Sequence, residues 1–137
     1  MIDKFRGKYF FLSNFYVAPV EYQGLTYRNN EAAFQSAKAK NKKDKEKFID
    51  LLAAEAKKLG RQIELRDDWE DVKIDVMHEV CMAKFTQNLL LKDKLLATGT
   101  EELVEGNNHG DTFWGCVDGK GENHLGKILM KVREELS

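Results

Sequence analysis

The chain has 137 residues, of which 42% are hydrophobic and 33% charged, and its formal net charge is −1. This length and composition predict one soluble globular domain with one hydrophobic core, spanning residues 1–137. The balanced charge gives no general support for nucleic-acid binding. No apolar run is long enough to cross a bilayer and the first residues lack a signal-peptide pattern, so we expect a cytoplasmic protein without a membrane partner.

Cysteine and histidine residues are few and widely spaced. Cys81 and Cys116 form no CxxC motif, so free thiols are expected rather than a disulfide. His78, His109 and His124 have none of the spacings that are typical of metal ligands. The sequence therefore predicts neither a metal site nor a cofactor.

The N-terminal segment is rich in aromatic residues. Residues 4–28 favour strands and turns, because Phe and Tyr are common in strands while Gly and Pro interrupt them. Residues 20–27 alternate across a turn and predict a short hairpin. Ser13 and Asn14 stand between apolar neighbours, where either turn chemistry or contacts to a ligand would explain them.

The stretch that begins at Asn30 is the most informative part of the chain. Asn30 or the asparagine before it can cap a helix, and Glu31 occupies the favoured first turn. Glu31, Gln35 and Lys38 fall on one helical face, with Phe34 beside them. A carboxylate, an amide and an amine placed together can move a proton, orient a substrate and offer a nucleophile. A solvated helix face would have the same spacing.

Two helices are expected after this one. The lysine-rich residues 38–47 are typical of a solvated connection, with a phosphate-binding patch as the alternative. Residues 45–59 predict a helix that ends at Gly60. Arg61 follows this glycine, where it could reach an anion or remain on the surface. Asp67 or Asp68 is expected to cap the next helix, which runs from Trp69 to about residue 91.

The apolar stripe of that long helix includes a charged residue. Lys84 falls on the stripe, where it would either extend to solvent or need a carboxylate partner. The apolar members of the stripe are Val72, Val76, Met77, Val80, Cys81 and Phe85.

The C-terminal third contains a long glycine-rich loop. A short helix over residues 92–98 is expected to end at Gly99. Residues 105–124 hold half of the ten glycines, and the pair Phe113 and Trp114 argues against disorder there. Asn123 is expected to cap a last helix, whose N-terminus offers N–H groups to an anion.

Nine short motifs occur in an order that indicates a known family. They are Phe11-Leu12-Ser13-Asn14-Phe15, Asn30-Glu31 with Phe34-Gln35 and Lys38, Leu59-Gly60-Arg61, Trp69 with Val72-Lys73 and Val76-Met77, Ala83-Lys84-Phe85, Leu95-Leu96-Ala97-Thr98-Gly99, Leu103-Val104-Glu105, Trp114-Gly115, and Asn123 with Leu125-Gly126 and Leu129-Met130. From Phe5 to Leu136 the chain resembles the YbiA-like family, also called NADAR for its association with NAD and ADP-ribose metabolism.

The resemblance implies a fold and an activity. The fold would be a compact, mainly α domain with a small β component near the N-terminus. The activity would be metal-independent hydrolysis of N-ribosidic bonds. The substrate would be a phosphorylated ribosylaminopyrimidine of riboflavin biosynthesis, or an ADP-ribosylated guanine, free or within nucleic acid. A non-catalytic nucleotide or ADP-ribose binding module is the alternative, and a nucleic-acid binder that uses residues 38–47 is a third.

The resemblance also implies roles for particular residues. The family's essential glutamate matches Glu31, and Asp111 would be the second carboxylate of an acid/base pair. Lys38 would either form a Schiff base with an opened ribose, or bind phosphate or pair with Glu31. Trp69 and Trp114 would stack on a flat base, with a place in the core as the alternative for each. The remaining expected substrate-binding residues are Ser13, Asn14, Gln35, Arg61 and Asn123.

The chain departs from the family pattern at two places. Ala32 and Ala33 stand where relatives commonly have His and Tyr, beside the catalytic glutamate. Cys116 stands where relatives commonly have Asp after Trp-Gly. Both departures bear on the choice of substrate more than on the reaction type.

Overall fold

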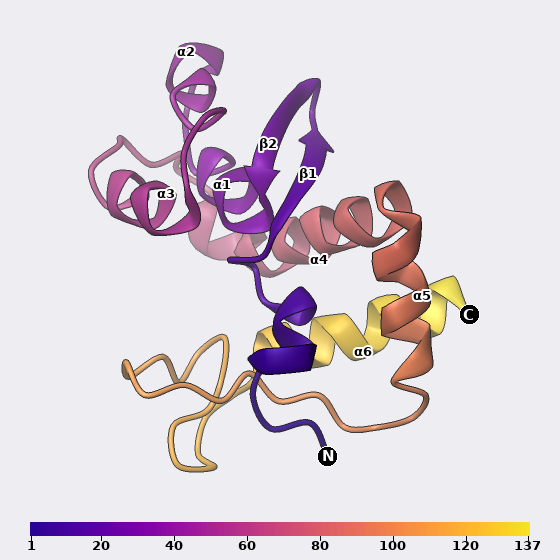
Figure 1. Ribbon diagram of the computed structural model, residues 1–137. Helices are drawn as coiled ribbons and strands as arrows, with labels where there is room; N and C mark the ends of the chain where they lie inside the picture. Colours follow the sequence, from indigo (N-terminus) through magenta and orange to yellow (C-terminus); the bar gives the residue numbers. More distant parts are fainter. The chain divides into compact units, whose positions relative to one another are not determined.

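The computed structural model describes all residues from 1 to 137. Helices dominate, and the single sheet has two strands near the N-terminus, so the predicted fold class is confirmed. The elements, shown in Figure 1, are η1 (Gly7–Leu12), β1 (Val17–Tyr22), β2 (Leu25–Asn29), α1 (Asn30–Ser36), α2 (Lys42–Glu46), α3 (Ala53–Gly60), α4 (Trp69–Gln87), α5 (Leu89–Ala97) and α6 (His124–Leu136).

The chain divides into two compact units, which we describe separately. The central unit comprises Asn14–Asn88, and the terminal unit comprises Met1–Ser13 together with Leu89–Ser137. None of the helices is both long enough and apolar enough to cross a membrane.

The predicted hairpin is present in the central unit. β1 pairs with β2 in an antiparallel register that sets Tyr22 opposite Leu25. The turn residues Gln23 and Gly24 both have positive φ, 51° and 86°, as a two-residue type I′ turn requires. β1 packs against α4, which passes beside the hairpin in Figure 1.

The expectation of strand structure was wrong just before the hairpin. Gly7–Leu12 forms a 3₁₀ helix, which begins at a glycine with a φ of 60°. The backbone N–H of Ser13 donates to the carbonyl of Phe10 and closes the last turn. Aromatic content predicted strand here, but a local turn pattern satisfies this backbone without a partner strand.

Helix α1 begins as predicted, but it ends before Lys38, which was expected on its face. The Asn29 side chain caps it by accepting from the Ala32 N–H at 2.8 Å, and also donates to the carbonyl of Leu51 at 3.1 Å. The helix ends at Ser36, so Lys38 lies in the following turn. Every residue of α1 is buried, so the alternative of a solvated face is wrong for this helix.

The helix expected over residues 45–59 is two helices. Asn41 caps α2 by accepting from the Asp44 N–H at 2.9 Å, so this helix starts at Lys42, before the predicted residue 45. It ends at Glu46. A second start follows at Leu52, whose N–H donates to the Glu55 carboxylate at 2.9 Å. These two local caps divide the segment, and α3 ends at Gly60 as predicted.

Helix α4 begins at Trp69 as predicted but ends at Gln87. Asn88 leaves the helical conformation and donates to the carbonyls of Lys84 and Pro19 at 2.8 and 3.0 Å. Helix α5 therefore starts at Leu89 and not at residue 92. The buried residues of α4 include all but one apolar member of the predicted stripe, namely Val76, Met77, Val80, Cys81 and Phe85.

Lys84 is buried within this stripe, with 1% of its surface exposed. Burial lowers its pKa to about 8, and the electrostatic interaction with Cys81 acts in the opposite direction. Above pH 8 the folded chain therefore releases this proton before the unfolded chain, whose lysine titrates near its ordinary value. From pH 8 to pH 9, the titration of Lys84 alone should raise the free energy of unfolding by about 1 kcal/mol. Burial raises the pKa of Cys81 to about 11, so the unfolded thiol ionises first and offsets part of this rise within the same pH range.

Urea titrations between pH 8 and pH 9 measure this rise. The Lys84→Met variant should lose it, because the titrating group is gone. Lys43→Met, at an exposed position of α2, should keep it. An unchanged pH slope in Lys84→Met would contradict the prediction.

The terminal unit joins the chain's first residues to its last helices. Ile2 forms a parallel bridge with Leu103, with hydrogen bonds from Ile2 N–H to the Glu102 carbonyl and from Val104 N–H to the Ile2 carbonyl, each at 2.8 Å. Helix α6 packs against α5. The buried apolar residues on the face of α6 are Leu125, Ile128, Leu129 and Val132.

Candidate active site

The centre of the candidate site is the carboxylate of Glu31 in the first turn of α1. The residue is 8% exposed, and its backbone N–H donates to the Asn14 carbonyl at 3.0 Å. The Gln35 amide nitrogen donates to Glu31 Oε2 at 2.6 Å. Positions four apart on a helix bring these two side chains together, and the helix N-terminus favours a negative charge there.

Gly60 lies against this pair. Helices α1 and α3 pack together in the central unit, and Gly60 is the last residue of α3. A Cβ atom at this position would overlap the end of the Gln35 side chain. Gly60 does not have a positive φ, so its backbone does not require glycine. Glycine in a helix costs roughly 0.5–1 kcal/mol relative to alanine, so the close approach of Gln35 accounts for it better than helix termination does.

Lys38 is half-buried in the turn after α1. Its Nζ lies 5.9 Å from the centroid of the Trp69 ring. Burial lowers the pKa of this amine, and the attraction of Glu31 only partly offsets the effect, while the nearby Arg61 and Lys73 lower it further. The Lys38 amine therefore loses its proton at lower pH than an exposed lysine does.

Trp69 forms the apolar side of the site. Its exposed fraction is 5%, and its ring lies 5.2 Å from that of Phe34, centroid to centroid, at an interplanar angle of 55°. The ring thus belongs to the core and at the same time lies beside the Lys38 amine. Stacking of a substrate base on Trp69 stays a prediction.

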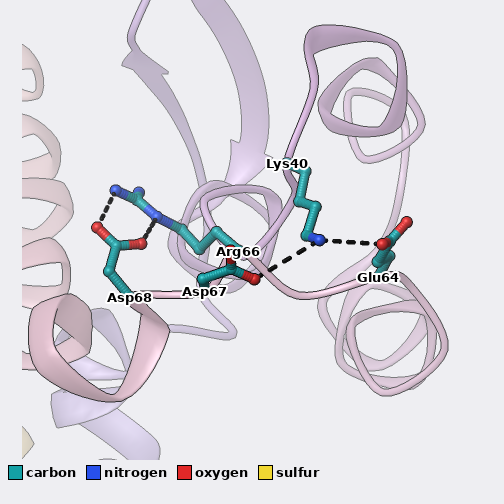
Figure 2. A network of polar contacts seen from close by, with 5 residues as sticks. All are labelled: Lys40, Glu64, Arg66, Asp67 and Asp68. Atoms are coloured by element: carbon teal, nitrogen blue, oxygen red, sulfur yellow. Dashed lines mark hydrogen bonds and ion pairs between the residues drawn. The ribbon is translucent and has the colours of Figure 1, made fainter.

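A polar network fixes the segment that leads into Trp69, as Figure 2 shows. Lys40 pairs with Glu64 at 3.0 Å and with Asp67 at 3.6 Å. Arg66 donates to both carboxylate oxygens of Asp68, at 2.6 and 3.0 Å. This pairing lowers the pKa of Asp68. Asp68 is the residue before α4 but its side chain makes no cap bond, because the carboxylate is occupied by Arg66.

Backbone contacts complete this junction. The Arg66 N–H donates to the Lys38 carbonyl at 2.8 Å, and Ala39 forms an antiparallel bridge with Leu65. The Trp69 N–H in turn donates to the Arg66 carbonyl at 3.3 Å. Exposed ion pairs contribute little stability each, about 0–1 kcal/mol. The backbone bonds therefore hold Lys38 and Trp69 near each other, and the ion pairs assist them.

Asn14 and Arg61 lie at two other positions of the central unit. Asn14 is buried, accepts from the Asn30 amide at 2.8 Å and donates to the sulfur of Met77 at 3.4 Å. Arg61 is exposed at the end of α3. The charge of Arg61 acts on Lys38. A role for Asn14 or Arg61 in substrate binding stays a prediction.

The central unit thus brings together Glu31, Gln35, Lys38 and Trp69.

The other predicted site residues lie in the terminal unit. Asp111 Oδ1 accepts from the N–H groups of Phe113 and Trp114, at 3.1 and 2.9 Å. The Trp114 ring meets Phe113 edge-on, with centroids 4.8 Å apart. Ser13 is half-buried at the end of η1. Catalysis by Asp111 and substrate contacts by Ser13 and Trp114 stay predictions.

Asn123 has a structural role that the sequence did not predict. It precedes α6 with a φ of 52°, and its side chain makes no cap bond. Instead its amide donates to the Leu103 carbonyl and accepts from the Glu105 N–H, both at 2.9 Å. The prediction that Asn123 caps α6 was therefore wrong, because its side chain instead bonds to Leu103 and Glu105, far earlier in the chain. Its predicted contact with substrate stays untested.

Three residues affect the site in ways that the sequence did not predict. Lys73 and Glu70, which pair at 2.8 Å, act electrostatically on Lys38. In the sequence, the one indication of this effect was that Lys73 lies one helical turn after Trp69. The effect of Gly60 on Gln35 had no signal, because the two residues belong to different helices.

No three His, Cys, Asp or Glu side chains gather as a metal site would require. Cys81 and Cys116 are both free and buried. The candidate site contains the buried Glu31 carboxylate and the Lys38 amine, whose pKa is lowered mainly by burial.

The fold is mainly helical with a small hairpin, and its first helix carries a hydrogen-bonded carboxylate–amide pair. The NADAR domain profile matches residues 3–137. The chain therefore belongs to the NADAR domain family, and the resemblance found in the sequence is confirmed.

Curated relatives and a solved structure agree with this assignment. N-glycosidase YbiA of Escherichia coli (strain K12) is 38% identical over 129 residues, covering 91% of this chain and 80% of that protein. An N-glycosidase of Nostoc punctiforme is 41% identical over 132 residues, covering 90% of this chain and 83% of that protein. The NMR structure of E. coli YbiA superposes with a TM-score of 0.84 at 36% identity, covering 99% of this chain and 86% of that one.

A longer relative carries a different name. A riboflavin biosynthesis protein of Vibrio vulnificus is 42% identical over 130 residues, which is 92% of this chain but 35% of that protein. The chain thus spans about a third of the length of this relative.

Proposed function

We propose that this chain is an N-glycosidase that hydrolyses the N-ribosidic bond of a phosphorylated ribosylaminopyrimidine, an intermediate class of riboflavin biosynthesis. The enzyme class expected from the sequence is confirmed by the relatives named N-glycosidase. The observation that carries the proposal is the buried Glu31 carboxylate, bound by Gln35. ADP-ribosylated guanine is the second substrate class, and the family's association with ADP-ribose favours it.

Glu31 supplies the acid/base chemistry in this proposal. Cleavage of an N-ribosyl bond requires a proton for the leaving nitrogen and stabilisation of positive charge on the ribose. A buried carboxylate can serve either need, because little water competes for it. Asp111 is proposed as the second carboxylate, and Trp69 and Trp114 as stacking surfaces for the base.

Lys38 opens a covalent route. Its amine would attack C1 of the ring-opened ribosylamine, and the leaving amine would depart with a proton supplied by Glu31. Water would then hydrolyse the resulting imine to the free sugar aldehyde and restore the lysine. The lowered pKa of Lys38 supports this role, since the neutral amine is the nucleophile. Phosphate binding or pairing with Glu31 is the alternative role for this residue.

The riboflavin branch rests on relatives. The V. vulnificus protein bears a riboflavin biosynthesis name, and this chain spans only part of it. Ala32 and Ala33, in place of the His and Tyr common in relatives, lie on the same buried helix as Glu31. We therefore expect any change in substrate preference to originate at these positions or at Cys116, the other departure from the family pattern. We also propose that residues 1–137 act as one domain and that the protein is cytoplasmic.

A product assay tests the function. The purified chain is incubated in EDTA with a ribosylaminopyrimidine phosphate or with ADP-ribosylated guanosine, and products are identified by mass spectrometry. Release of ribose phosphate would support the riboflavin branch, and release of ADP-ribose would support the second. Binding without release from either would replace the proposal with the non-catalytic binding module.

A further inference from the structure

We infer that Gln35 is a positioning residue that holds the Glu31 carboxylate, and that Gly60 is a glycine because a larger residue would displace Gln35. Gln35 was expected from the sequence to contact substrate, and this inference gives it a different role. The inference rests on the proposed function, since it takes Glu31 as the acid/base group.

The orientation of the Gln35 amide supports the inference. Only its nitrogen can donate to the carboxylate, and it lies 2.6 Å from Glu31 Oε2. The amide oxygen, Gln35 Oε1, therefore faces away from Glu31, and it is buried with no hydrogen-bond partner. A buried acceptor without a partner is costly. The amide nitrogen thus bonds to Glu31 although this orientation leaves the amide oxygen without a partner in the protein.

Gly60 provides the space for this orientation. The three atoms nearest to a Cβ at position 60 would be Oε1, Cδ and Cγ of Gln35, all in one side chain. These atoms form the flexible end of the side chain, so an alanine would displace the Gln35 amide and leave the backbone in place. Gly60→Ala, a change on α3, is therefore a means of displacing the Gln35 side chain on α1.

Displacement of the amide would affect turnover more than substrate affinity. Glu31 would lose the hydrogen bond that Gln35 donates to its Oε2. Misplacement of a catalytic group by about 1 Å can cost on the order of 10²-fold in rate. Contacts that bind the remainder of the substrate would be unchanged, so KM should change little.

A double-mutant cycle tests the inference. The values of kcat and KM are measured for the full chain, Gly60→Ala, Gln35→Ala and the double variant, with Lys58→Ala, an exposed change on α3, as the control. We expect Gly60→Ala to lower kcat by about 10²-fold, with KM changed by less than about threefold. In the Gln35→Ala background the second change should have almost no effect, because the side chain that it displaces is gone.

Two results would overturn the inference. One is an unchanged kcat in Gly60→Ala, and the other is a full additional loss in the double variant. Thermal unfolding shows whether each variant is folded. If Gly60→Ala does not fold, NMR of the wild-type Gln35 side-chain amide decides. Its protons should be protected from exchange and should lose protection in Glu31→Ala, and unprotected protons would contradict the inference.

The product assay and the NMR measurement together separate this inference from the proposed function. Wild-type protein that releases no product from either substrate would contradict the function. The NMR result would still show whether Gln35 holds Glu31.

Discussion

Glu31→Gln should lower turnover by about 10²–10⁴-fold, the usual contribution of a general acid or base. The substitution preserves the size of the side chain but removes its capacity to exchange a proton at neutral pH. Substrate affinity should remain close to that of the wild type, because glutamine fills the same space in α1. Steady-state kinetics give kcat, and isothermal titration with the slow variant gives affinity.

The matched control for this prediction is Glu46→Gln, an exposed carboxylate on α2. It should retain wild-type kinetics, since its side chain is exposed and it is not a residue of the candidate site. Retention of full turnover by Glu31→Gln, with product release by the wild type, would exclude Glu31 as the acid/base group. Retained binding by a wild type without turnover would instead support the non-catalytic module.

Lys38→Arg should lower turnover by on the order of 10³-fold or more if Lys38 is the covalent nucleophile. Arginine keeps the positive charge, but its guanidinium is never neutral at accessible pH and cannot form the imine. Reduction of the wild-type reaction with cyanoborohydride should add the mass of the reduced sugar adduct to the chain. Peptide mapping should locate this adduct at Lys38.

The pH dependence has a defined sign. The neutral amine is the reactive form, so the rising limb of the rate against pH should follow the pKa of Lys38. Burial lowers that pKa below the ordinary lysine value, so this limb should lie at lower pH than for an exposed lysine. Lys42→Arg, at an exposed position, is the control and should leave the profile unchanged. Retained activity in Lys38→Arg, with no adduct in the wild type, would assign Lys38 to phosphate binding or to pairing with Glu31.

Local signals in the sequence predicted the elements of the site well. Asparagine and glutamate before an alanine-rich stretch specify the start of a helix through capping alone, and α1 begins there. The spacing of Glu31 and Gln35 places them on one helical face whatever surrounds the helix, and their side chains are bonded. The alternating residues around Gln23 and Gly24 specify the hairpin in the same local way.

Element boundaries were predicted less well because competing local caps decide them. Asn41 and Leu52 each start a helix within one apparently continuous helical segment. Asn88 ends α4 through bonds to carbonyls of its own helix and of the strand β1. These choices depend on which backbone partner a polar side chain reaches, and the partner can lie far away in sequence.

The sequence by itself determined the family, the mainly helical fold with its hairpin, and the residue types available for catalysis. These follow from local periodicity, capping and motif order. Only the tertiary structure decided that α1 is buried, that Trp69 lies beside the Lys38 amine, and that Gly60 accommodates Gln35. Burial and packing between helices cannot be read from local spacing, and they decide whether the pKa of a carboxylate or an amine is shifted.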